Sequence, residues 1–72
     1  MKFQELDVVR LVKPVPDSEL RAGQVGAVVM VFSNPNEAYE VEFCSESGET
    51  IAMLALKPDY LSFVETAHKL AA

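Results

Sequence analysis

The sequence predicts an all-β fold of short strands, and three observations point to it. Runs rich in β-branched and aromatic residues recur along the chain and are separated by clusters of Pro, Gly, Asn and Ser. One run, residues 38–43, alternates between apolar and acidic side chains, which is typical of a strand with one buried face. A Pro-Asp-Tyr segment near the end of the chain indicates a single tight helical turn.

The first two strands are predicted at residues 7–12 and 25–32. The first is rich in Val and ends at a Pro-Val-Pro segment, which cannot continue to donate hydrogen bonds to a neighbouring strand. The polar residues 17–24 form the loop that follows, and Gly23 is placed to supply a positive φ before the chain re-enters the sheet. Residues 25–32 are almost continuously apolar, which favours a strand buried on both sides.

The next two strands, residues 38–43 and 50–56, are predicted to pair as a hairpin across a Gly-containing turn. The alternation in the first of them places Tyr39, Val41 and Phe43 on one face and Glu40 and Glu42 on the other, toward water. The second is apolar throughout, although its Ala, Met and Leu residues also favour helices.

The chain closes with the helical turn at residues 57–61 and a last strand at 62–64. The tail, residues 65–72, contains no breaker and is open to extending as a helix or to fraying. No repeat, linker or low-complexity segment divides the chain, so residues 1–72 are expected to form a single domain with its core at about 5–64. Five short strands, a long first loop and a one-turn helix before the last strand indicate a small, strongly bent SH3-like barrel. An open meander of four strands covered by a C-terminal helix is the alternative.

Eight apolar residues are candidates for the interior. They are Val8, Val12, Val29, Val31, Val41, Phe43, Ile51 and Met53. A one-residue error in register would exchange the faces of a strand. The opposite faces of the second and fourth strands are also apolar and comprise Val28, Met30 and Phe32, and Ala52, Leu54 and Leu56. One small interior cannot hold both sets, so the surplus is expected to pack against the tail, a second copy or another protein, unless strand coiling buries both faces.

Composition limits the class of protein. The chain has 72 residues, a net charge of −5, one Cys and no Trp. A chain of this size buries only about 60% of its surface on folding, and a single Cys provides neither an internal disulfide nor a complete zinc site. Its apolar runs are short and its N-terminus lacks a signal-peptide pattern, so a cytoplasmic protein without a membrane span is expected.

The residue types that carry chemistry are few. Cys44 and His68 are the only soft nucleophiles or ligands, and no spacing pairs them or lowers the pKa of the thiol. Glu40 and Glu42, with Glu46 or Glu49, lack the dense oxygen ligands of a strong calcium loop. We therefore predict no catalytic residues, no metal site and no cofactor, and the protein is not expected to be an enzyme.

Several segments of the chain together resemble one bacterial family. They are Asp7-Val8-Val9, Gly23 with residues 26–29, residues 39–43, Gly48-Glu49-Thr50 and residues 58–61. In these segments the chain is similar to the domain of unknown function 4926 family, over about residues 5–64. The resemblance implies an SH3-like barrel and carries over no catalytic or cofactor residue.

Residues 22–29 are also similar to a glycine-containing motif of ribosomal and transcription-elongation barrels that touch RNA. The charge pattern argues against that role, because no Lys or Arg occurs between Arg21 and Lys57 while five Glu residues do. Nucleic acid is therefore not an expected partner. We interpret Gly23 as a turn residue and Gly26 as a bulge or a close approach between strands.

The surplus of apolar strand residues beside an acidic hairpin predicts a non-enzymatic protein-interaction module that binds itself or a basic partner. The residues expected to bind the partner are Met30, Phe32, Leu54, Leu56, Tyr60, Glu40 and Glu42. Tyr39, Tyr60 and Phe63 suggest an aromatic groove for proline-rich peptides, but core packing is favoured for most of them. The alternatives are an antitoxin or immunity-type inhibitor of a basic toxin and a small nucleic-acid-binding barrel.

Overall fold

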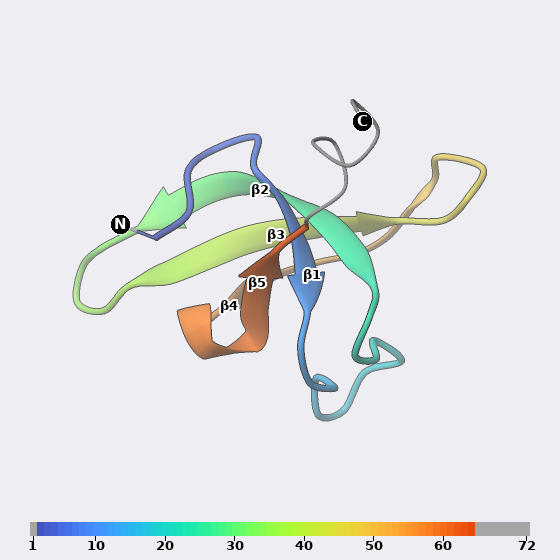
Figure 1. Ribbon diagram of the computed structural model, residues 1–72, viewed down its shortest axis with the longest axis horizontal. Coiled ribbons are helices and arrows are strands. Elements are labelled where there is room, and N and C mark those ends of the chain that lie inside the picture. Colours follow the sequence, from blue (N-terminus) through green and yellow to red (C-terminus); the bar gives the residue numbers. More distant parts are fainter. Residues whose placement is uncertain (1, 65–72) are drawn as a thin grey trace, which may run out of the picture.

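Five antiparallel strands form one sheet in the order β4-β3-β2-β1-β5 (Figure 1). The computed structural model describes residues 2–64. The strands are β1 (Val8–Leu11), β2 (Val25–Phe32), β3 (Ala38–Cys44), β4 (Thr50–Leu56) and β5 (Leu61–Phe63), with a single 3-10 turn, η1 (Pro58–Tyr60), before β5. No membrane-spanning candidate was found among the helices of the described residues.

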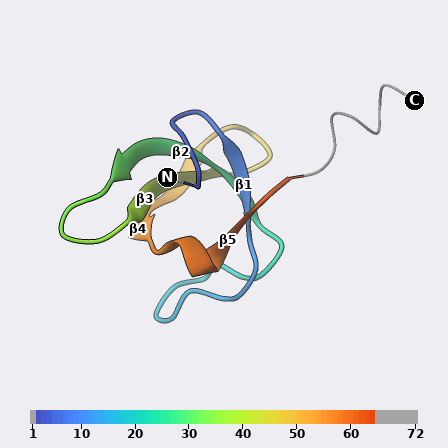
Figure 2. The ribbon, with the colours of Figure 1, turned by 60° about the vertical axis from the view of Figure 1, so that its left-hand side comes forward.

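The all-β prediction is confirmed, including the short helical turn before the last strand. The bounds of β2 and β4 agree with the prediction, and those of the other strands differ by one residue at their ends. The sheet curls around its core (Figures 1 and 2), but β4 and β5 are its two edges, so backbone pairing does not close it into a barrel. The sheet has five strands, not the four of the alternative meander, and the tail at 65–72 lies outside the described residues.

The predicted interior was wrong for half of its members, because the register could not be read from uniformly apolar strands. Val8, Val12, Ile51 and Met53 are exposed, Val29 and Val31 are half-buried, and only Val41 and Phe43 are fully buried. In β2 a register shift falls between Val28 and Met30, so Val28 points inward while Met30 and Phe32 are exposed. In β4 the inward positions are Ala52, Leu54 and Leu56, which face the core in place of Ile51 and Met53. A bulge and a slip of one residue each exchange the faces of a strand.

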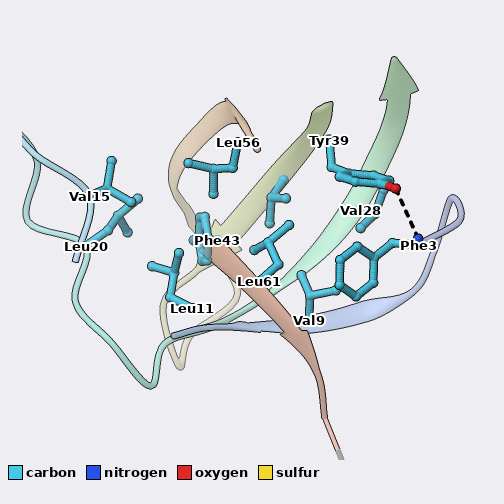
Figure 3. Packing of buried hydrophobic residues seen from close by; sticks show 11 residues of the cluster. Phe3, Val9, Leu11, Val15, Leu20, Val28, Tyr39, Phe43, Leu56 and Leu61 are labelled. Carbon is cyan, nitrogen blue, oxygen red and sulfur yellow. Dashed lines mark hydrogen bonds between the residues drawn. The ribbon is translucent and has the colours of Figure 1, made fainter. Parts of the chain in front are cut away.

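The core combines strand residues with residues that cover the inner face of the sheet. Its members are Phe3, Val9, Leu11, Val15, Leu20, Val28, Tyr39, Val41, Phe43, Leu56 and Leu61 (Figure 3). Val15 and Leu20 come from the long loop between β1 and β2, which is held by the Ser18 hydroxyl donating to the Val15 carbonyl. Phe3 comes from the N-terminal arm and packs edge-on against Tyr39, with ring centroids 5.1 Å apart. These three residues close the inner face from outside the sheet.

The Tyr39 hydroxyl fastens the arm to the sheet. It accepts hydrogen bonds from the backbone amides of Lys2 and Phe3, at 3.0 and 3.2 Å, and donates to the Glu37 carboxylate. Figure 3 shows the bond to the Phe3 amide. Burial, with the hydrogen bond to Glu37, raises the pKa of the Tyr39 phenol, and the hydrogen bonds from Tyr39 and the Lys2 amide lower the pKa of Glu37.

Two glycines occupy the positions that the sequence assigned to them. Gly23 has a φ of +97°, which confirms it as a turn residue. Gly26 lies where β3 approaches closely, since a Cβ there would be 2.7 Å from the Glu42 carbonyl oxygen and 2.8 Å from Phe43. The glycine therefore permits the close packing of β2 on β3.

Candidate functional site

The side of the sheet away from the core, which we call the outer face, carries exposed apolar side chains around two carboxylates. Cross-strand pairing defines it, because directly paired residues lie on the same side of a sheet. One row runs Val8, Ala27, Glu42, Met53 across β1 to β4, and a second runs Met30, Glu40, Ala55 across β2 to β4. Phe32 and Ala38 form a further pair on this side. Val8, Met30, Phe32 and Met53 are all exposed.

A carboxylate stands in the middle of each long row. Glu40 lies between Met30 and Ala55, and Glu42 lies between Ala27 and Met53. The two Glu residues are two positions apart on one strand, so their Cα atoms are roughly 7 Å apart. Glu42 accepts a hydrogen bond from the Thr50 hydroxyl, and both Glu residues are half-buried. The outer face therefore presents two negative charges within apolar surroundings.

Hollows lie at both ends of the outer face. One, of about 250 Å³, is lined by Val8, Val25, Gly26, Ala27, Glu42 and Cys44. The other, of about 390 Å³, lies beside the β2–β3 loop, and its lining includes Phe32, Ala38 and Ala55 together with the charged residues Glu37 and Lys57. A protein docked on the outer face would therefore contact a concave, mostly apolar surface at each end and the two carboxylates between them.

Positive charge lies at the margins of the outer face or away from it, and Lys57 lines the hollow beside the β2–β3 loop. Lys13 forms a 2.7 Å ion pair with Asp59 and stacks over the Tyr60 ring at 4.4 Å. The hydrogen bond between Lys13 and Asp59 raises the pKa of the lysine and lowers the pKa of the carboxyl group. Arg10 pairs with Val25 at the β1 side of the outer face. Strands β2, β3 and β4 contain no Lys or Arg, so the centre of the outer face stays acidic.

The structure divides the residues predicted to bind a partner into two groups. Met30, Phe32, Glu40 and Glu42 lie together on the outer face. Leu56 is buried in the core, and Leu54 and Tyr60 are half-buried against it, so these three are not part of that surface. The pairing register also places Val8, Ala27, Met53 and Ala55 on the outer face, and the sequence-based prediction did not include these four.

The three aromatic residues weighed as a peptide groove do not come together as one. Tyr39 is buried, and both Tyr39 and Phe63 pack against Phe3. Tyr60 packs against the core and under Lys13. Core packing was the reading favoured from the sequence, and it holds for Tyr39.

The remaining candidates for chemistry are isolated in the described part of the chain. Cys44 is an exposed free thiol at the end of β3, and His68 falls outside the described residues. Within residues 2–64, no three His, Cys, Asp or Glu side chains are grouped so that they could hold a metal ion.

Comparison with known families gives a match over most of the chain. The family model described as "Domain of unknown function (DUF4926)" matches residues 5–63 of the chain. No curated protein and no solved structure was matched.

Proposed function

Because the chain belongs to the DUF4926 family, whose description assigns no activity, we propose its function from its own surface: a non-enzymatic module that binds a protein partner through the outer face. The observation that supports this proposal is the pair of apolar rows with Glu40 and Glu42 at their centres. Exposed apolar side chains gathered on one face of a small protein are a common feature of interaction sites.

The carboxylates specify the chemistry of that partner. Covering Glu40 and Glu42 removes water from two charges, which is costly unless cations and hydrogen-bond donors replace it. A partner that presents Lys or Arg among apolar side chains meets this requirement, and the net charge of −5 would assist its approach. Two copies docked face to face would instead bring four carboxylates together, so the outer face suits a different protein.

An inhibitor of a basic toxic enzyme is a special case of this proposal. Such an enzyme would offer the cations that the outer face requires, and electrostatic steering would speed its capture. Co-expression with a basic toxin encoded beside the gene would then restore growth. A nucleic acid is the less favoured ligand, because its phosphates would meet the two carboxylates.

Affinity capture from the native host, with charge-reversed variants, tests the proposal. We expect the wild-type chain to retain a basic protein and Glu40→Lys/Glu42→Lys to lose it by at least about tenfold, because the reversal places like charges at the centre of the contact. The matched control is Glu5→Lys/Glu46→Lys, which changes net charge equally at exposed positions off the outer face and should retain the partner.

Two outcomes would contradict the proposal. Equal retention by all three proteins would show that the outer face is not the contact. Equal loss in both variants would show that net charge alone governs capture. Binding of RNA or DNA in a low-salt mobility shift, unchanged by the outer-face reversal, would favour the nucleic-acid alternative.

A further inference from the structure

Strand β4 leaves one of its two edges unpaired. It pairs with β3 along Thr50–Leu56 and stands last in the sheet order, so alternate N–H and C=O groups point away from the sheet without a strand partner among the described residues. The opposite edge, β5, is only three residues long. A short edge strand is one of the usual protections against further pairing, and β4 does not have it.

The sequence of β4 also lacks two other common protections, which are charged residues and Pro. Residues 50–56 contain no charged residue and no Pro, and the side chains of Ile51 and Met53 are exposed. One irregularity in the β3–β4 pairing falls near Ile51, at the start of the strand, which leaves Ala52–Leu56 as a regular edge. Such an edge is a template for backbone pairing with another strand.

The charges at the two ends of β4 favour a second copy of β4 as the strand that pairs with its free edge. Glu49 precedes the strand, Lys57 follows it, and both are exposed. In an antiparallel pair of two β4 strands centred on Met53, the residue numbers of opposite positions sum to the same value over the regular segment Ala52–Leu56. Continuing both strands beyond this segment brings Glu49 of one copy near Lys57 of the other. The arrangement occurs twice about the two-fold axis, and no like charges face each other within the strands.

The surroundings of the edge agree with this register. Glu19 lines a hollow of about 370 Å³ together with Ile51 and Ala52, at the end of β4 where the second copy would bring its Lys57. Pairing at the edge also leaves Glu40 and Glu42 uncovered, since they project from the outer face of β3. A parallel arrangement would place the two Glu49 side chains at one end and the two Lys57 side chains at the other.

We propose that two copies of the chain pair through their β4 edges in antiparallel orientation, so that one continuous sheet runs through the dimer and Glu49 of each copy lies beside Lys57 of the other. This self-association uses an edge that is separate from the centre of the outer face. Its failure would leave the proposed partner binding intact, and the reverse also holds.

The first test compares two Met→Lys variants by sedimentation equilibrium at micromolar to millimolar protein concentrations. We expect a wild-type dimer and a monomeric Met53→Lys, because that change places two Lys side chains together at the two-fold axis. Met30→Lys is the matched control: Met30 is 50% exposed against 51% for Met53, but lies on β2, and it should remain dimeric. A wild-type monomer throughout this range, or equal effects of the two variants, would overturn the proposal.

The second test uses charge reversal at the strand ends at low salt. Glu49→Lys and Lys57→Glu should each raise the dimer dissociation constant about fivefold, because each places like charges at both ends of the paired strands. The double variant restores opposite charges and should recover wild-type affinity. Additive weakening in the double variant would exclude the antiparallel register.

Hydrogen exchange supplies a readout that does not depend on substitutions. On raising the wild-type concentration through the dissociation constant, amides of β4 that do not pair with β3 should become protected. Protection elsewhere in the described sheet, with β4 unchanged, would place the dimer contact at another surface.

Discussion

The two faces of this sheet are both rich in apolar side chains, yet only one of them is a core. The inner face is covered by Phe3 from the N-terminal arm and by Val15 and Leu20 from the long loop. The outer face has comparable side chains at Met30 and Met53, but the described residues place no such cover on it, and two carboxylates interrupt it. The difference shows that a hydrophobic strand position becomes interior only when another segment of the chain covers it.

Truncating one large side chain on each face should give the largest difference in the free energy of unfolding. Phe43→Ala removes a fully buried ring and should reduce the free energy of unfolding by about 3–5 kcal/mol. Met30→Ala removes an exposed side chain and should change it by less than about 0.5 kcal/mol. Urea denaturation at a concentration where the protein is monomeric measures both.

Because so large a loss could unfold a small domain, Phe43→Leu provides a milder variant that should still be clearly less stable than wild type. Equal stability of Phe43→Leu and Met30→Ala would contradict the assignment of the inner face.

Removing the Tyr39 hydroxyl, which holds the N-terminal arm against the core, should have an intermediate effect on the free energy of unfolding. Tyr39→Phe leaves the buried Phe3 amide without its hydrogen-bond partner, and it should lower the free energy of unfolding by about 1–3 kcal/mol. Tyr60→Phe is the control, since the hydrogen bonds that fasten the arm do not involve Tyr60, and it should change stability by less than about 0.5 kcal/mol. Thermal unfolding compares the variants, and equal melting temperatures for the two would show that the hydrogen bonds to the Tyr39 hydroxyl do not stabilise the fold.

The smallest expected effect is a pH dependence of stability that comes from Glu37, the half-buried carboxylate that accepts the hydrogen bond from the Tyr39 hydroxyl. The hydrogen bonds from the Tyr39 hydroxyl and the Lys2 amide lower the pKa of Glu37 from its ordinary value of 4.5. A lowered folded-state pKa stabilises the fold above the unfolded-state value, and this contribution is lost as pH falls through the folded-state pKa. Glu37→Gln should therefore be less stable than wild type at pH 7, with the difference shrinking below about pH 4.5.

Melting temperatures between pH 7 and pH 3 measure this effect, with Glu46→Gln as an exposed acidic control. A constant difference between wild type and Glu37→Gln across that range would show that the ionised carboxylate is not the stabilising form.

The amino-acid sequence by itself determined where the strands and turns lie and which face of β3 is buried. Alternation of Tyr39, Val41 and Phe43 with Glu40 and Glu42 specifies which side is buried, and Gly23 marks a turn that requires a positive φ. The sequence also predicted that Met30, Phe32, Glu40 and Glu42 belong to a binding surface, and the pairing register places these four on one face.

The tertiary structure decided the faces of β2 and β4 and the segments that cover the core. Apolar residues occur at nearly every position of these strands, so no periodicity identifies the inward side, and a bulge in β2 between Val28 and Met30 changes it midway. Phe3 stands in a polar arm, and only the long-range contact with Tyr39 brings it into the core. Burial at these positions depends on segments distant in the sequence, and a local pattern does not contain that information.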